Sequence, residues 1–196
     1  KSIEKQGFLT PELEKLIADA ETLIEVEDIY LPFKPKRKTR ATIAKEKGLE
    51  PLAQRIFDQV KLDLDAEAAS FINTELGVNS DEEALAGARD IIAEWISENQ
   101  DARKNVRELF WKEGVIQASV YKTKEESEEA QKFKDYFDWK EPISKTPSHR
   151  LLAMRRAEKE AIISLDIAPN EEAANNLLEQ QFVKTKSSSG EQIEIG

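Results

Sequence analysis

Apolar residues recur every three or four positions along most of the chain, which is the spacing of one face of an α-helix. One such stripe covers residues 13–24 and follows Thr10 and Pro11, a pair that favours the start of a helix. Another covers residues 85–96 and follows Ser80 and Glu83, which have the spacing of a capping box. Because only seven prolines and seven glycines interrupt the 196 residues, the pattern predicts a mainly α fold.

Shorter elements are predicted between and after these stripes. Short helices are expected from Arg40 and from Pro51, separated by Gly48, and Asp65 is expected to cap a helix that runs to Gly77. Further helices are expected over residues 101–113, 148–160 and 170–182. Two short segments rich in β-branched residues, 115–121 and 161–167, predict a minor two-stranded β element.

The length allows one domain or two small ones. We expect a multi-helix region over residues 1–183, with room for a sub-boundary near residues 115–147. Residues 184–196 contain a run of serines and a glycine after Lys184 and Lys186, a composition typical of a linker or tail.

Composition narrows the function classes. The chain has no cysteine and one histidine, His149, which excludes disulfides, thiolate zinc sites and a histidine metal cluster within it. No apolar run approaches the roughly 18–20 residues that span a bilayer, and residues 1–4 lack the pattern of a signal peptide. We therefore expect a cytoplasmic protein without a membrane partner.

The common catalytic motifs do not occur in this sequence. The glycines form no phosphate-binding loop pattern, and neither G-x-S-x-G nor H-E-x-x-H is found. The acidic clusters at residues 81–83 and 125–129 lie at a helix start and on a charged helix, where capping and solvation explain them. The sequence thus predicts no catalytic residue, metal site or cofactor, and favours a non-enzymatic protein.

Charge is distributed unevenly along the chain. The formal charge is −10, yet residues 34–47 hold seven basic residues and one acid, Glu46. A concentrated basic patch on an acidic protein is a candidate for contact with nucleic-acid phosphates, and a solvated lysine-rich loop is the alternative. The candidate residues are Lys34, Lys36, Arg37, Lys38, Arg40, Lys45 and Lys47.

A second, smaller basic group lies in the helix predicted from residue 148. Its candidate binding residues are Arg150, Arg155 and Arg156. Because Arg150 and Arg155 are not one helical turn apart, the group can be split between two faces.

The residue spacing in the two short helices around Gly48 also resembles that of a helix-turn-helix. Ala44 is followed by Gly48 four residues later and then by Leu49. Gln54, however, falls where that motif usually has an apolar residue. Sequence-specific DNA reading and a plain helical hairpin therefore both stay open.

Several segments of the chain resemble the bacterial Tex family of transcription accessory proteins. The resemblance is carried by five blocks in family order: residues 28–44, 48–53, 84–94, 133–137 and 147–153. The chain departs from the family at Ala157 and Ala161, where relatives tend to have glycine. That departure leaves the expected turn from helix to strand in doubt.

The resemblance implies that this chain is most of the helical N-terminal region of a longer multidomain protein. Such proteins also contain an RNase H-like domain, helix-hairpin-helix modules and an RNA-binding OB-fold, which this chain lacks. The matched blocks contain no catalytic motif. We therefore expect a non-enzymatic scaffold that acts in transcription by binding RNA or DNA, transcription machinery or both.

Two alternatives remain at this point. One is a protein-interaction module that docks RNA polymerase, ribosomal components or other domains of the same parent chain. The other is a helix-turn-helix DNA binder. In the main hypothesis, Pro32 and Pro35 hold the basic stretch extended, and Tyr30 and Phe33 either stack on bases or pin the stretch to the core.

Overall fold

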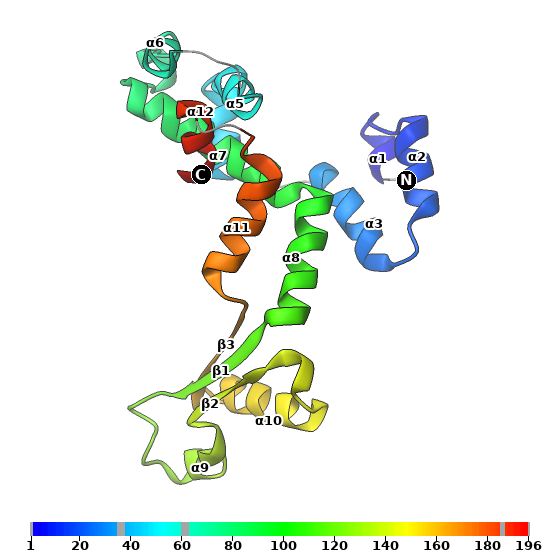
Figure 1. The fold of residues 1–196 in the computed structure, drawn as a ribbon, viewed down its shortest axis with the longest axis vertical. Coiled ribbons are helices and arrows are strands. Elements are labelled where there is room, and N and C mark those ends of the chain that lie inside the picture. Colours follow the sequence, from blue (N-terminus) through cyan, green and yellow to red (C-terminus); the bar gives the residue numbers. More distant parts are fainter. Residues whose placement is uncertain (1, 35–37, 60–62, 185–186, 196) are drawn as a thin grey trace. The chain divides into compact units, whose positions relative to one another are not determined.

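The fold was obtained as a computed structural model that describes residues 2–34, 38–59, 63–184 and 187–195. The chain divides into two compact units (Figure 1). Unit 1 comprises residues 1–104 and 178–196, and unit 2 comprises residues 105–177. The division therefore lies at 104/105 and 177/178 rather than between 115 and 147, because strand pairing ties Val115 to Ala168 inside unit 2.

Unit 1 is built from helices, as the apolar spacing predicts. Its α-helices are α1 (Ser2–Lys5), α2 (Pro11–Asp19), α3 (Leu23–Tyr30), α4 (Arg40–Glu46), α5 (Glu50–Phe57), α6 (Leu64–Ala69), α7 (Asp81–Glu98) and α12 (Ser188–Ile195). Two 3₁₀ turns, η1 (Leu31–Phe33) and η2 (Thr74–Leu76), lie between them. The helix α8 (Gln100–Glu113) begins in unit 1, and α11 (Glu171–Phe182) ends there.

Local capping explains where several of these helices begin. Thr10 caps α2 by accepting from the Leu13 amide, as predicted. The predicted single stripe over residues 13–24 is instead two helices, because Thr22 and Glu25 form a capping box that starts α3. Asp63, not Asp65, caps α6, which ends at Ala69 rather than continuing to Gly77.

The core of unit 1 lies where α4 and α5 pack on α7. Leu49, Leu52, Ile56, Ile91 and Ile92 are fully buried there. The two short helices are joined by Gly48, whose φ of +79° is the left-handed conformation that glycine adopts without strain. The chain thus turns at Gly48 between two short helices that both pack on α7.

The C-terminal segment was expected to be a linker or tail, and for residues 188–195 that expectation is wrong. They form α12, which packs against α5 and α7 and buries Ser189, Gly190 and Ile193. The run of serines and a glycine has no apolar stripe, so the sequence did not indicate this helix. In the structure the small residues Ser189 and Gly190 are buried where α12 packs on α5 and α7. Lys186 lies outside the described residues.

Unit 2 contains a small antiparallel sheet with the strand order β2–β1–β3. The predicted pair is confirmed as β1 (Val115–Val120) and β3 (Ile163–Ala168). A third strand, β2 (Asp138–Pro142), was missed because its sequence, DWKEP, is polar and ends in proline. The element is therefore three-stranded rather than two-stranded, and the fold as a whole is mainly α.

The helices α9 (Glu128–Gln131) and α10 (Ser148–Lys159) and the turns η3 (Lys134–Tyr136) and η4 (Ile143–Lys145) complete unit 2. Its own core is formed by Ile116, Ala118, Met154, Ile162 and Ile163. The turn from α10 to β3 is made at Ala161 with a φ of +53°, in the left-handed region that glycine would occupy more easily.

Candidate nucleic-acid interface

The basic residues predicted to contact phosphates are distributed around α4. Lys34 follows η1, Lys38 and Arg40 lie at the entrance to α4, Lys45 lies in its last turn, and Lys47 is its C-cap. Lys36 and Arg37 lie outside the described residues. The stretch is therefore not one uniform loop, and its basic residues have different surroundings.

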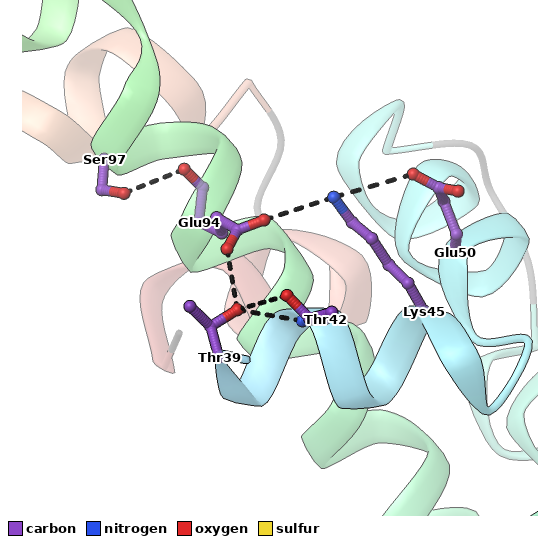
Figure 2. Close-up of polar contacts among 6 residues, drawn as sticks. All are labelled: Thr39, Thr42, Lys45, Glu50, Glu94 and Ser97. Atoms are coloured by element: carbon purple, nitrogen blue, oxygen red, sulfur yellow. Dashed lines mark hydrogen bonds and ion pairs between the residues drawn. The ribbon is translucent and has the colours of Figure 1, made fainter. Parts of the chain in front are cut away.

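The start of α4 is fixed by hydroxyl groups and by one carboxylate of α7 (Figure 2). The Thr39 hydroxyl accepts from the Thr42 amide at 3.0 Å and donates to the Glu94 carboxylate at 3.0 Å. It also lies 2.8 Å from the Thr42 hydroxyl. Because its one hydrogen points to Glu94, Thr39 both caps α4 and ties it to α7.

The same carboxylate of Glu94 holds Lys45 (Figure 2). The Lys45 ammonium lies 3.3 Å from Glu94 and 3.9 Å from Glu50 at the start of α5. The side chain of Glu94 is only 12% exposed, so leaving it without a cation would be costly. Lys45 is therefore engaged in joining three helices, which leaves its charge largely balanced inside the protein.

Lys47 has a structural contact of another kind. Its ammonium donates to the Gly77 carbonyl at 2.7 Å, and Gly77 ends η2 with a φ of +74°. The contact joins the turn after α4 to a turn thirty residues later in the chain. Lys47 thus stabilises a helix C-terminus, where the free carbonyls favour a cation.

Lys34, Lys38 and Arg40 form the α4 entrance patch and are the exposed part of the predicted stretch. Lys38 pairs with Glu46 at 2.7 Å and Arg40 with Asp90 at 3.4 Å, and their side chains are 62% and 86% exposed. Exposed pairs of this kind contribute only about 0–1 kcal/mol. Lys34 is exposed, and the described residues provide it with no ion pair.

The aromatic residues beside this patch differ from the exposed platforms that stack on bases. Phe33 is half-buried, and its ring lies 6.1 Å from that of Phe8 in a tilted arrangement. Tyr30 is also half-buried. These contacts favour the interpretation in which the two rings hold the segment against the N-terminal helices.

The second basic group, in unit 2, is split between faces of α10. Arg150 faces the sheet: its guanidinium makes two hydrogen bonds with Glu141, at 2.7 and 3.0 Å, and lies 4.8 Å from the centre of the Trp139 ring. Arg155 is exposed and pairs with Glu158. Arg156 is exposed, and within the described part of the chain it has no ion pair.

Glu141 is held in its charged form by this arrangement. Partial desolvation acts to raise the pKa of the Glu141 carboxyl, but the two hydrogen bonds from Arg150 and the charge of its guanidinium outweigh it. The pKa of Glu141 therefore lies below its ordinary value. Arg150 is thus a structural residue of unit 2, bound to β2, and not a free cation.

Thr39, Glu94 and Glu141 were missed by the sequence reasoning. The sequence did contain a signal for Glu94, since it lies next to the apolar stripe of a long amphipathic helix. A carboxylate buried at such a position needs a cation or a hydrogen-bond donor. Glu141 gave a weaker signal, because its partner Arg150 is brought to it only by the fold.

The described residues contain no candidate metal site and no candidate membrane-spanning helix. Over these residues no three His, Asp or Glu side chains gather in a way that would hold a metal ion. Among the same residues, no helix has both the length and the apolar character needed to cross a membrane.

Comparison with known proteins gives one consistent family. A family described as Tex central region-like matches residues 59–193. The chain is 44% identical over 167 residues to "Protein tex" of Bordetella pertussis, covering 85% of this chain and 21% of that protein. It is 42% identical over 192 residues to YdcI of Bacillus subtilis, covering 97% and 27%. It is 39% identical over 165 residues to "Transcriptional accessory protein Tex" of Neisseria gonorrhoeae, covering 84% and 21%.

The chain thus spans about a fifth to a quarter of the length of these curated relatives. The matches are well above 30% identity and extend over most of the chain. The family match alone covers more than half of it. This chain belongs to the Tex family.

Proposed function

We propose that the chain is a non-enzymatic helical scaffold of a transcription accessory protein, and that the α4 entrance patch contacts nucleic-acid phosphates. The role in transcription is taken from relatives named as accessory proteins, of which the chain spans only a part. The observation that carries the phosphate contact is the exposure of Lys38 and Arg40, 62% and 86%, in pairs that are weak enough to exchange.

The proposed contact is electrostatic and reads no sequence. A few lysine and arginine side chains on phosphates give affinities on the order of 10⁻⁴–10⁻⁶ M at physiological salt. Lys45 and Lys47 are left out of the proposal because each already has a partner inside unit 1. We expect this activity in the cytoplasm, because proteins of oxidising compartments often contain disulfides and this chain has no cysteine.

The helix-turn-helix alternative is ranked second. It has the helix pair α4–α5, but in that motif the start of the second helix faces base edges and phosphates. The exposed residues there are Glu50 and Pro51, and Arg55 further along is paired with Glu67. A negative charge at this place repels DNA, so the proposed contact lies before α4 rather than on α5.

The proposal is tested by fluorescence anisotropy with single-stranded RNA and with duplex DNA at rising salt. In the variant Lys34→Ala/Lys38→Ala/Arg40→Ala we expect RNA binding to weaken at least tenfold and its dependence on salt to become shallower, since fewer phosphates are neutralised. Failure of the unchanged chain to bind at about 50 mM salt would contradict the proposal.

The matched control removes the same charge elsewhere. Lys122, Lys132 and Lys134 are exposed in unit 2, and their change to alanine should leave binding within about twofold. Equal loss in both triple variants would mean that only net charge matters, and the α4 entrance patch would then not be a site. A selection experiment that returns a consensus DNA sequence would favour the helix-turn-helix alternative.

A further inference from the structure

The helices α2 and α3, drawn in blue in Figure 1, are amphipathic but bury little of their apolar side. Every residue of α2 is at least partly exposed. Large apolar residues on this part of the chain are strongly exposed: Phe8 59%, Leu16 51%, Leu23 74% and Ile24 48%. We call these four residues the N-terminal apolar face.

Little of this segment is buried. Among the described residues of α1, α2 and α3 the buried ones are Ile3, Asp28 and Ile29, and none of them belongs to either of the two hydrophobic cores. A helix whose apolar stripe is left in water loses the main source of its stability. The exposure of several large apolar residues on two packed helices therefore marks a contact surface rather than the scattered exposure usual for soluble proteins.

The helices are nevertheless held in place. The carboxylate of Asp28 in α3 is buried and accepts from Arg103 at 2.7 Å. The capping box of Thr22 and Glu25 fixes the turn between α2 and α3, and Thr10 caps α2. The exposed apolar residues thus lie on ordered helices, so less conformational entropy is lost when a partner binds.

Charge identifies the partner. Residues 9–29 contain seven acids and one base, Lys15. The acids Glu12, Glu14, Asp19, Glu21 and Glu27 are exposed around the apolar residues. This rim repels nucleic acid and anionic lipid surfaces, and attracts lysine and arginine side chains.

We infer that the N-terminal apolar face docks a basic amphipathic helix of a separate protein partner. The partner's apolar stripe covers Leu16, Leu23 and Ile24, while its lysines and arginines meet the acidic rim. This contact goes beyond the phosphate contact proposed above and does not depend on it, because the two surfaces carry opposite charge.

The first test uses the whole chain and a synthetic probe. The probe is a twenty-residue helical peptide of leucine, alanine, lysine and arginine with its leucines on one face, and a scrambled peptide of the same composition is its control. We expect the amphipathic peptide to bind in the micromolar range and the scrambled one at least tenfold more weakly. Equal binding of the two peptides would show charge attraction alone and would overturn the inference.

Variants locate the contact. Leu16→Ser/Leu23→Ser should weaken binding of the peptide about tenfold or more, since each leucine loses its burial against the partner. Glu14→Lys/Glu21→Lys should weaken it as well. The matched control is Leu152→Ser in unit 2, which is 69% exposed and should bind as the unchanged chain does. An unaltered affinity in the double leucine variant would refute the proposed face.

The second test identifies what the face touches in cells. A photo-crosslinking amino acid at position 23 should yield a cross-link to a segment that is rich in lysine and arginine and has helical apolar spacing. Cross-links only to a second copy of this chain, to lipid or to RNA would overturn the inference.

The phosphate proposal is tested separately in the same proteins. The leucine variant should bind RNA normally, and the Lys34→Ala/Lys38→Ala/Arg40→Ala variant should bind the peptide at least as well as the unchanged chain. Failure of one proposal therefore leaves the other standing, and the two failures are distinguishable.

Discussion

At the scale of single residues, identical charges have different roles because of their immediate neighbours. Lys38 and Lys45 lie seven positions apart, yet one is paired at the surface and the other joins Glu94 and Glu50 across three helices. Arg150 and Arg156 differ in the same way in unit 2: one is held by Glu141, and the other is exposed. In each of these two pairs only the residue that remains in solvent, Lys38 or Arg156, is available to a ligand.

Glu141 gives a prediction at this scale. Because its pKa in the folded protein lies below the ordinary value of 4.5, its charged form stabilises the fold. That stabilisation is fully present above about pH 4.5 and is lost as the pH falls through the lower folded pKa. Glu141→Gln should therefore lower the melting temperature at pH 7, and this effect should shrink steadily as the pH falls below 4.5.

The measurement is thermal unfolding followed across this pH range. Glu128→Gln is the control, since Glu128 is exposed on α9. A difference between Glu141→Gln and the unchanged chain that is the same at pH 7 and pH 3 would show that the charge of Glu141 is not what stabilises unit 2.

At the scale of elements, close approach between helices decides how α4 and α5 sit on α7. Gly87 lies in the middle of α7, where an added Cβ would overlap Cδ1 of Leu49 and lie 3.3 Å from Cβ of Ala44. Leu49 is 1% exposed, so its side chain has little room to move away. The glycine is needed for packing, although glycine lowers the stability of a helix interior.

Gly87→Ala should therefore destabilise unit 1 by about 1–3 kcal/mol, despite the better helix propensity of alanine. The control is a double-mutant cycle with Leu49→Ala, which removes the overlapping methyl group. In that background Gly87→Ala should be neutral or stabilising, since only the propensity gain remains. Chemical unfolding of the four proteins measures their free energies of unfolding. Additive effects of the two substitutions would contradict the packing argument.

At the scale of the whole molecule, unit 1 is completed by residues from the far end of the chain. Gln59 donates to the Phe182 carbonyl at 2.8 Å and accepts from the Lys184 amide at 2.7 Å, and α12 packs on α5 and α7. The family match begins at residue 59, whereas Leu49, Leu52 and Ile56 belong to the same core as Ile193. The matched region is therefore not by itself a complete folding unit.

Ile193→Ala should destabilise unit 1 by about 2–4 kcal/mol, because Ile193 is 5% exposed in this core. Ile195→Ala is the matched control: Ile195 is 65% exposed on the same helix, and the change should cost less than about 0.5 kcal/mol. Amide hydrogen exchange should show faster exchange in α5 and α7 and unchanged exchange in β1 and β3. Equal effects of the two isoleucine variants would mean that α12 does not stabilise the core.

The sequence by itself determined the local features. Apolar periodicity and caps located α4, α5, α7 and α10 to within a few residues, and they located the start of α2. Segments rich in β-branched residues located β1 and β3, because all of these signals act over a few neighbouring positions. The stripe over residues 13–24 was predicted too long since a capping box inside it outweighs continued periodicity. The family resemblance was also visible in the sequence alone.

Only the tertiary structure decided which of these residues remain available for function. The partners of Lys45, Lys47 and Arg150 lie on other elements, up to forty-nine positions away for Lys45, and no local pattern predicts such a pairing. The same holds for β2 and α12, whose polar or small residues are ordered by neighbours rather than by their own propensity. The physical reason is that burial and ion pairing depend on distance in space, whereas capping and periodicity depend on distance along the chain.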